Sequence, residues 1–447
     1  MLHRCIAIAL LCSVLPALGQ VQNPTARMQQ IIQSYAANKT FMGTVLVSKD
    51  GKLLIDQGYG FADLEWNIPN VPDAKFRLGS LTKQFTAASI LLLQERGKLK
   101  VEDPVSKYVP NTPAAWKNIS IFNLLTHTSG IPNFTSFPDY RTTEWKDTTP
   151  TELLGRFRDK PLDFEPGTKF SYSNSGYIVL GYILEKVSGQ TYAEFLQKNI
   201  FTPLGMADTG MDNNAVILPK RAQGYTPSAN GIQHAGYTSM TIPFSAGALN
   251  STTGDLLKWE QGLFGGKVLK PASLAKMTTP FKGGYGFGLF IGTENGHKTI
   301  NHGGGIEGFN TSLAYYPDDK LAVIVLSNLN GSAADQIGAD LGKVALGEPV
   351  TLPSERKEVQ VPVKILNEYV GTYQLAPNFS VTMTVEDGQL MTQATGQSKF
   401  PLFAESDTKF FLKVVDAQVE FFRDPTTHAV THLTLYQNGA SHEGKKQ

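Results

Sequence analysis

Residues 76–97 read FRLGSLTKQFTAASILLLQERG, a loop that runs into a mostly apolar helix. Gly97 stands where a glycine commonly ends a helix. If the helix begins at Ser80, Lys83 lies on the same face, and its amine can reach the serine hydroxyl. A serine beside an amine is a candidate nucleophile with its base, and the N-terminus of the helix would stabilise an oxyanion.

The Ser-x-x-Lys pattern alone is weak evidence, because the chain contains it four times. The pairs are Ser80/Lys83, Ser273/Lys276, Ser354/Lys357 and Ser406/Lys409. The last three lie in a short segment stopped by a proline, in a charged linker and in a polar turn. The context therefore selects Ser80, for which the alternative role is a helix cap with Lys83 extended toward solvent.

Two further motifs support a catalytic role. Tyr172-Ser173-Asn174 lies in a turn before a helix that begins near Ser175, and residues 301–310, NHGGGIEGFN, form a glycine-rich run between two apparent strands. Ser-x-x-Lys, Tyr-Ser-Asn and His-Gly-Gly-Gly, in this order, resemble the motifs of the serine β-lactamase and penicillin-binding protein superfamily. Residues 124–131, LLTHTSGI, are similar to a segment of its class C-like branch. The resemblance covers roughly residues 25 to 345.

This resemblance implies a role for each motif residue. Ser80 would attack a carbonyl carbon, and either Lys83 or Tyr172 would take its proton. The sequence leaves the choice of base open, since Tyr172 would need a pKa well below its usual value of about 10. The backbone amides of Ser80 and Gly305 would bind the oxyanion. Asn174 would bind Lys83 and the substrate amide, or else simply cap a helix.

The third motif departs from the Lys-Thr-Gly form of most β-lactamases. His302 takes the lysine position and Gly303 the threonine position, followed by Gly304, and the resemblance assigns all three to substrate binding. A fixed cation there would attract a substrate carboxylate, whereas a histidine is largely neutral at pH 7. We therefore expect peptides or esters to be preferred over β-lactams. If His302 faces the site, acid pH should favour carboxylate-bearing substrates.

The N-terminus is typical of a secretory signal peptide. Residues 1–19 combine Arg4, an apolar run too short to span a bilayer, and the small-residue site at 17–19. We expect a secreted or periplasmic protein without a transmembrane anchor. Cys5 and Cys12 both lie in this segment, so the mature chain should contain neither a disulfide nor a cysteine nucleophile.

Composition excludes several classes of function. The 447 residues are 41% hydrophobic and 18% charged with a net charge of +1, as in a soluble protein of about two or three domains. The near-neutral charge argues against nucleic-acid partners. His428 and His432 would lie too far apart along a strand to share a metal ion, and we expect no metal and no cofactor. The oligomeric state cannot be read from the sequence.

The fold class expected before residue 348 is α+β. An antiparallel sheet flanked by helices, plus a helical lobe, should form a β-lactamase/D,D-peptidase-like domain over 20–347. Helices dominate from 80 to 265. The other expected elements are a helix at 26–37, strands at 44–48, 52–55, 285–291, 311–316 and 321–327, and a helix at 333–345.

The C-terminal part is expected to be a small up-and-down β-barrel. A linker at 348–362 precedes it, and residues 363–447 contain short alternating strands. The strands are 381–385, 390–394, 410–414, 419–423 and 431–436. Asp387-Gly388 and Asn438-Gly439 are turn sequences. The pattern resembles the lipocalin-like domain appended to some serine hydrolases of the superfamily, and a packed interior is favoured over a ligand cavity.

The motifs together indicate a serine hydrolase that forms an acyl-enzyme on Ser80. The expected substrates are peptides of D-amino-acid or peptidoglycan type, or esters, as for a D,D-carboxypeptidase, an aminopeptidase or an esterase. The alternatives are a β-lactamase, a non-catalytic protein that binds penicillin or peptidoglycan, and an interaction role of the barrel. An α/β-hydrolase is excluded because the chain lacks a Gly-x-Ser-x-Gly elbow.

Overall fold

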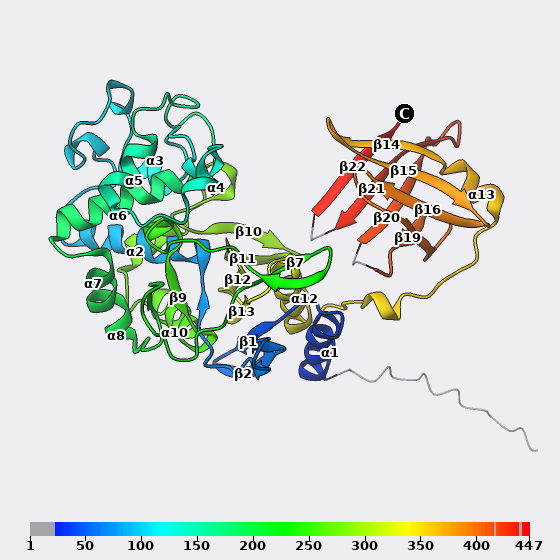
Figure 1. Ribbon diagram of the computed structural model, residues 1–447, viewed down its shortest axis with the longest axis horizontal. Coiled ribbons are helices and arrows are strands. Elements are labelled where there is room, and N and C mark those ends of the chain that lie inside the picture. Colours follow the sequence, from blue (N-terminus) through cyan, green and yellow to red (C-terminus); the bar gives the residue numbers. More distant parts are fainter. Residues whose placement is uncertain (1–22, 415–416, 438–439) are drawn as a thin grey trace, which may run out of the picture.

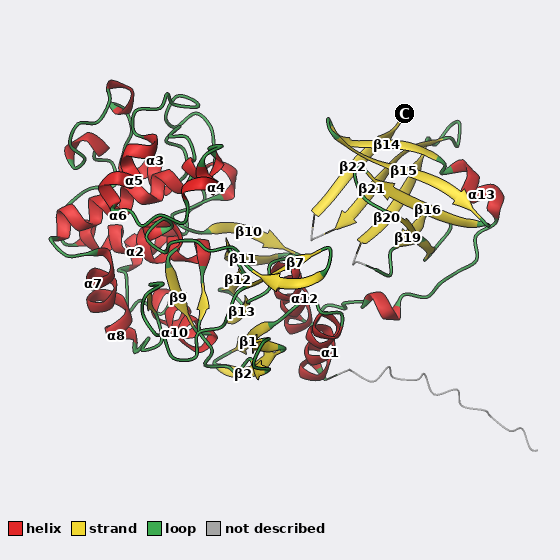
Figure 2. Cartoon of the chain, viewed as in Figure 1, coloured by secondary structure: helices red, strands yellow, loops and turns green. Residues whose placement is uncertain are grey.

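The computed structural model describes residues 23–414, 417–437 and 440–447. Figure 1 shows a helical lobe, a sheet with flanking helices and a separate C-terminal body of strands, and Figure 2 marks the helices and strands. The expected signal peptide with Cys5 and Cys12, and the expected Asn438-Gly439 turn, lie outside the described residues. No helix within these ranges is long and apolar enough to cross a membrane.

The central sheet pairs strands from both ends of the region before residue 348. Within the described residues it holds six antiparallel strands in the order β10, β11, β12, β13, β1, β2. Their bounds are β1 (Gly43–Lys49), β2 (Lys52–Tyr59), β10 (Phe290–Glu294), β11 (His297–Ile306), β12 (Phe309–Tyr316) and β13 (Leu321–Ser327). β1 pairs with β13 in a register that places Val45 opposite Val325. This confirms the expected α+β architecture.

Different helices cover the two faces of this sheet. Val45 and Val47 pack in one apolar cluster with helices α1 (Pro24–Ala37) and α12 (Ala333–Leu346). Leu46, between them in the chain, belongs to the larger cluster on the other face. Strand side chains alternate between faces, so both faces of β1 are apolar. β13 is buried along its whole length, as its sequence LAVIVLS suggests for a central strand.

Helix α2 (Thr82–Glu95) lies in the larger cluster and is buried from Thr82 to Leu93. A helix without a polar face needs cover on all sides, and α6 and α9 pack against it. The helices between α2 and β10 are α3 (Ile121–Leu125), α4 (Tyr140–Thr143), α5 (Pro150–Phe157), α6 (Asn174–Ser188), α7 (Tyr192–Leu196), α8 (Thr202–Leu204), α9 (Phe244–Gly247), α10 (Thr253–Phe264) and α11 (Pro271–Met277).

Ser80 lies in a short 3-10 turn, Gly79–Leu81, immediately before α2. The α-helix therefore begins two residues later than the sequence suggests, although the helical turn still brings Ser80 and Lys83 together. Strand β5 (Phe76–Arg77), which leads into this turn, pairs with β9 (Leu249–Ser251). The serine is thus held between a small sheet and a buried helix.

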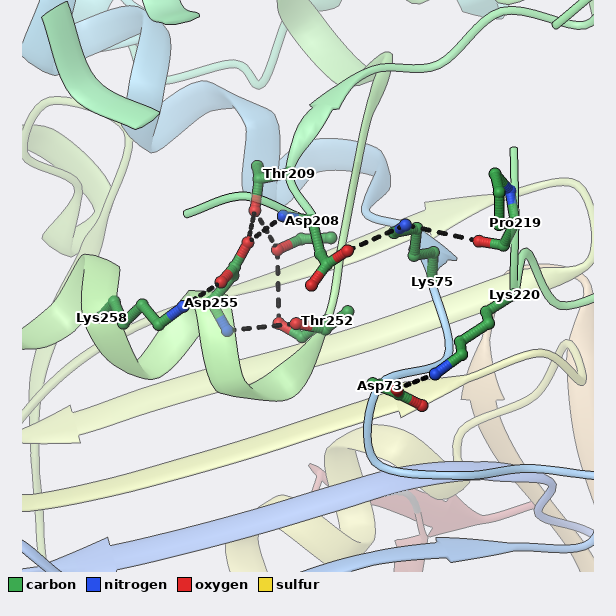
Figure 3. A network of polar contacts seen from close by, with 10 residues as sticks. Asp73, Lys75, Asp208, Thr209, Pro219, Lys220, Thr252, Asp255 and Lys258 are labelled. Atoms are coloured by element: carbon green, nitrogen blue, oxygen red, sulfur yellow. Dashed lines mark hydrogen bonds and ion pairs between the residues drawn. The ribbon is translucent and has the colours of Figure 1, made fainter. Parts of the chain in front are cut away.

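A polar network fixes the segments that approach this small sheet (Figure 3). Thr252 caps α10 by accepting a hydrogen bond from the Asp255 amide at 3.1 Å. The Asp255 carboxylate accepts from the Asp208 amide at 2.7 Å and from the Thr209 hydroxyl at 3.0 Å. Lys75, just before β5, pairs with Asp208 at 2.9 Å. The chain leading to Ser80 is therefore tied to the N-terminus of α10.

Two expectations about the later strands are wrong. The glycine-rich run at 301–310 is not a loop between strands, because β11 continues through it to Ile306 and stays paired with β12 to that residue. The strand expected at 285–291 is β10, which begins only at Phe290. Gly288 has φ 73°, a left-handed conformation that interrupts an extended strand.

The C-terminal strands form the expected small barrel. The order in the sheet is β17, β16, β15, β14, β22, β21, β20, β19, β18, so pairing of β14 with β22 nearly closes it. The bounds are β14 (Gly371–Ala376), β15 (Phe379–Glu386), β16 (Gln389–Ala394), β17 (Lys399–Pro401), β18 (Phe403–Ala404), β19 (Lys409–Phe411), β20 (Ala417–Arg423), β21 (Val430–Gln437) and β22 (Ala440–Lys446). Asp387-Gly388 joins β15 to β16, both residues having positive φ as this hairpin turn requires.

Apolar side chains from the barrel strands and from helix α13 (Val363–Glu368) pack in its interior. Tyr369 stacks on Phe421 with ring centroids 4.0 Å apart, and Phe410 meets Phe421 edge to face. This cluster is separate from the two clusters around the central sheet. The barrel therefore has a core of its own.

Candidate active site

The first two motifs meet at Lys83. Its Nζ atom lies 3.0 Å from Ser80 Oγ and 2.8 Å from Asn174 Oδ1. The carbonyl oxygen of Ala246 in α9 also lies 2.8 Å away. Asn174 is the first residue of α6, and the Asn133 side chain holds its amide at 3.0 Å. Three segments far apart in the chain thus position one amine against one hydroxyl.

The burial of Lys83 favours its uncharged form. Burial lowers the pKa of the Lys83 amine well below its usual range. Two of its partners, Asn174 Oδ1 and the Ala246 carbonyl, can only accept hydrogen bonds. An uncharged amine donates one hydrogen to each and leaves its lone pair facing the Ser80 hydroxyl. That arrangement can take a proton from the serine.

Tyr172 also lies close to Ser80 and Lys83. Its hydroxyl hydrogen-bonds the Ser80 side chain, and Lys83 Nζ lies 4.8 Å from the centre of its ring. Burial raises the pKa of the Tyr172 phenol, and the hydrogen bond with Ser80 opposes this only in part. The phenol is therefore neutral near pH 7. Its ring also lies against His127, with centroids 4.2 Å apart.

His302 lies behind the site rather than in it. Its side chain is buried, with the residue 3% exposed. Nδ1 lies 2.6 Å from the Gly303 carbonyl, to which it must donate, so Nε2 accepts from the Tyr285 hydroxyl at 3.0 Å. Burial lowers the pKa of His302 to about 3. The pH-dependent substrate preference expected of an accessible His302 is therefore not expected here.

The glycines of the third motif allow strand β11 to approach the segment that leads into the Ser80 turn. A Cβ on Gly304 would lie 2.0 Å from the Leu78 carbonyl oxygen and 2.3 Å from Thr311 Oγ1. A Cβ on Gly303 would meet Asp335 and Thr311 at ordinary contact distance. Neither glycine lines the pocket at Ser80, whereas Gly305 does. The resemblance assigned substrate binding to Gly303 and Gly304, and the structure places Gly304 against the segment that leads into the Ser80 turn.

The pocket beside Ser80 has a volume of about 230 Å³. Its lining includes Ser80, Asn174 and Gly305, together with Arg141 and Glu307 at the entrance. A larger cavity of about 600 Å³ lies elsewhere, between α12 and the barrel strands, and contains none of the motif residues. Chemistry rather than size identifies the site.

Sequence reasoning missed the Ala246 carbonyl, which carries no motif and which no sequence signal could have found. His127 stands in the quoted LLTHTSGI segment, and its Nδ1 accepts from the Ser173 amide at 3.1 Å. It therefore shapes the backbone between Tyr172 and Asn174.

The other Ser-x-x-Lys pairs do not form a similar arrangement among the described residues. Lys276 pairs with Glu102 at 3.4 Å, and Lys409 pairs with Glu405 at 3.8 Å. Both amines are partly exposed. A search of the described residues also finds no group of three His, Cys, Asp or Glu side chains arranged to hold a metal ion.

Comparison with known families divides the chain in two. Residues 28–347 match the family model described as Beta-lactamase. Residues 355–445 match a domain of unknown function, DUF3471. The first match covers the central sheet, the helical lobe and all the motif residues.

Individual proteins show similarities of different extent. Penicillin-binding protein 4* of Bacillus subtilis (strain 168) is 29% identical over 94% of this chain and 98% of its own length. Teichoic acid D-alanine hydrolase of Staphylococcus aureus (strain MRSA252) is 27% identical over 70% of this chain and 77% of its own. The solved structure of an octameric penicillin-binding protein homologue from Pyrococcus abyssi superposes with a TM-score of 0.68 at 26% identity, covering 94% of this chain and 99% of that one.

Proposed function

Because this chain belongs to the beta-lactamase family of serine hydrolases, we propose that it hydrolyses peptides or esters of D-amino acids through an acyl-enzyme on Ser80. The observation that carries the proposal is the position of Lys83, whose amine faces the Ser80 hydroxyl at 3.0 Å and is held by two acceptors. Such an amine serves as a general base.

Acylation would use each motif residue in a separate role. Ser80 Oγ attacks the substrate carbonyl while its proton passes to Lys83. The backbone amides of Ser80 and Gly305, which line the same pocket, stabilise the oxyanion. Tyr172, hydrogen-bonded to Ser80, donates its proton to the leaving group, and the proton that Lys83 took from Ser80 replaces it. Water then releases the acyl group by the reverse sequence of proton transfers.

The charge of the third motif bears on the class of substrate that we propose. With His302 buried and neutral, the third motif presents no fixed cation to the carboxylate of a penicillin. The similarity to a teichoic acid D-alanine hydrolase supports an ester or amide of a D-amino acid instead. We therefore propose poor β-lactamase activity and better turnover of D-aminoacyl esters and peptides.

A fluorophosphonate probe for serine hydrolases tests the nucleophile. Intact mass should show one adduct in the parent protein and none in Ser80→Ala. Ser273→Ala, which alters another Ser-x-x-Lys pair, should label like the parent. Labelling that survives in Ser80→Ala would refute the assignment.

A second candidate is a penicillin-binding protein that forms an acyl-enzyme without rapid release. This candidate is supported by the similarity to Penicillin-binding protein 4*, which extends over both the beta-lactamase domain and the barrel. A penicillin adduct on Ser80 that persists for hours, with no turnover of D-alanyl esters, would support this candidate over the hydrolase.

We also propose that residues 1–19 direct export, so that the enzyme acts outside the cytoplasm. Sequencing of the mature N-terminus from an exporting cell should begin near residue 20. A mature chain that retains Cys5 or Cys12 would contradict this.

A further inference from the structure

Two carboxylates and one guanidinium meet at the entrance of the Ser80 pocket. Arg141, in α4 of the helical lobe, lies 2.7 Å from Glu307 in the turn between β11 and β12. The same Arg141 Nη1 atom lies 3.2 and 3.4 Å from the two oxygens of Glu144. These contacts join the helical lobe to the sheet across the entrance.

The charges of this group do not balance. One cation faces two acids, so the group carries a net charge of about −1 at pH 7. Burial raises the pKa of Glu144, and the neighbouring charge of Glu307 raises it further. The two acids therefore favour a cation between them.

The cation in this group is the part that can move. The Arg141 side chain is 71% exposed, whereas those of Glu144 and Glu307 are 10% and 18% exposed. Its guanidinium can therefore swing into water and give way to another cation. Without any cation the two mostly buried acids would carry unpaired charges, so the position between them favours a replacement for Arg141.

That position lies beside the reacting serine. Arg141 and Glu307 line the pocket of Ser80, and an adjoining cavity of about 470 Å³ is lined by Arg141, Glu144, Glu307 and Gly305. Other basic groups nearby have partners of their own or are uncharged. Beyond Glu307, Arg77 and Arg221 share the single carboxylate of Asp212, at 2.7 and 3.0 Å, and line a different cavity on that side of Glu307. Burial favours the uncharged amine of Lys83.

We propose that Glu307, supported by Glu144, binds the protonated amine of the substrate, and that Arg141 occupies its place in the free enzyme. The enzyme then selects D-aminoacyl substrates with a free amine over N-acylated ones. A substrate carboxylate bound to Arg141 is disfavoured, because it would meet two acids around one cation. This inference rests on the proposed acyl transfer at Ser80.

The kinetic test compares D-alanine 4-nitroanilide with its N-acetyl derivative. In the parent, kcat/KM should be at least about tenfold higher for the free amine. Glu307→Gln should remove most of that preference, mainly by raising KM. Arg141→Met should keep or increase it, since the position between the acids is vacated.

Glu102→Gln is the matched control, because Glu102 also pairs with a basic side chain but lies on an exposed surface outside the pocket. In Glu102→Gln, kcat/KM for the free amine divided by kcat/KM for the N-acetyl derivative should equal the parent's value. Equal kcat/KM for both substrates in the parent, or an equal loss for both in Glu307→Gln, would overturn the inference.

Binding to Ser80→Ala separates this inference from the proposed function, because it needs no turnover. Calorimetry with D-alaninamide should show tighter binding than with N-acetyl-D-alaninamide, and Glu307→Gln in this background should abolish the difference. If the probe fails to label Ser80 but this preference is seen, the proposed function fails and the amine site stands. If both amides bind Ser80→Ala equally, the amine site fails whatever the serine does.

Discussion

At the scale of single residues, the protonation of Lys83 decides the chemistry. The side chain is completely buried, and two of its three polar partners accept hydrogen bonds only. Tyr172 has the opposite tendency, because burial raises the pKa of its phenol and leaves its proton in place. Of the two candidates that the motifs left open, Lys83 is therefore the base that we propose.

Lys83→Met should lower the rate of Ser80 labelling and kcat/KM for a D-alanyl ester by about a thousandfold, the range for loss of a general base. Methionine retains the apolar stem, so a circular dichroism spectrum should be unchanged. Lys276→Met, in another Ser-x-x-Lys pair, should label like the parent. Labelling of Lys83→Met within about threefold of the parent would place the base elsewhere.

Glu260 in α10 is a second buried ionisable group, and it has no part in the proposed reaction. Both carboxylate oxygens are buried without a hydrogen-bond partner among the described residues. Burial raises the pKa of Glu260 to about 8. The folded protein therefore holds a proton there that the unfolded chain releases near its ordinary pKa of about 4.5.

Stability should consequently fall with rising pH because of Glu260. The favourable contribution is fully present below pH 4.5 and is lost as pH rises toward 8, since only the unfolded chain ionises freely. The free energy of unfolding should be measured in urea at pH 5 and at pH 8. Its decrease between these pH values should be smaller in Glu260→Gln than in the parent, by on the order of 3 kcal/mol. The exposed Glu102→Gln should retain the parent's pH dependence. Parallel curves for the parent and Glu260→Gln would show that Glu260 is ionised in the fold.

At the scale of secondary structure elements, strand β11 supports the serine turn from below. Thr311 of the neighbouring β12 donates to the Leu78 carbonyl at 2.8 Å, two residues before Ser80. Gly304 of β11 lies directly against the same carbonyl. Gly79, with φ 55°, completes the close contact with Gly305. The His-Gly-Gly-Gly motif thus allows this close packing, and its Gly305 amide is the oxyanion donor that we propose.

Gly304→Ala should therefore displace the Ser80 turn, because the added Cβ would lie 2.0 Å from the Leu78 carbonyl oxygen. We expect a stability loss of about 1–3 kcal/mol and a fall in kcat larger than the rise in KM. Gly292→Ala in β10 is the control, since its Cβ would meet only Thr299 Oγ1 at 3.4 Å. Unchanged kcat in Gly304→Ala would show that the turn tolerates the shift.

At the scale of the whole molecule, the site depends on one of two structured bodies. Every residue that lines the Ser80 pocket lies between Gly79 and Glu307. The barrel has its own apolar cluster, and its connection to the rest of the chain includes a pair between Arg27 of α1 and Glu355. No described residue of the barrel lines the pocket.

A chain that ends at residue 360 should therefore keep its active site. It retains the pair between Arg27 and Glu355 and all residues of the pocket. The Ser80 labelling rate should stay within about threefold of the full chain, because no contact in the pocket is lost. Circular dichroism and thermal unfolding would report whether the shortened chain folds. A folded chain with lost labelling would mean that the barrel acts on the site from a distance.

The sequence by itself determined the features that depend on neighbours in the chain. The apolar run after Ser80 predicts a buried helix, the spacing of Ser80 and Lys83 predicts their contact, and Asp387-Gly388 predicts a hairpin. Motif order within the family allowed Tyr172 and Asn174 to be grouped with them, and their catalytic roles stay predictions. Strand boundaries near Gly288 were missed, because a glycine's φ is set by its surroundings.

Only the tertiary structure decided the charge state of the site and the shape of its entrance. Lys83 donates a hydrogen bond to the carbonyl oxygen of Ala246, which lies 163 residues away in the chain. His302 is shielded from water by the packing around Tyr285. Arg141 and Glu307 meet across 166 residues of chain. Burial and long-range contacts set pKa values and local charge, and neither is written in the spacing of residues along the chain.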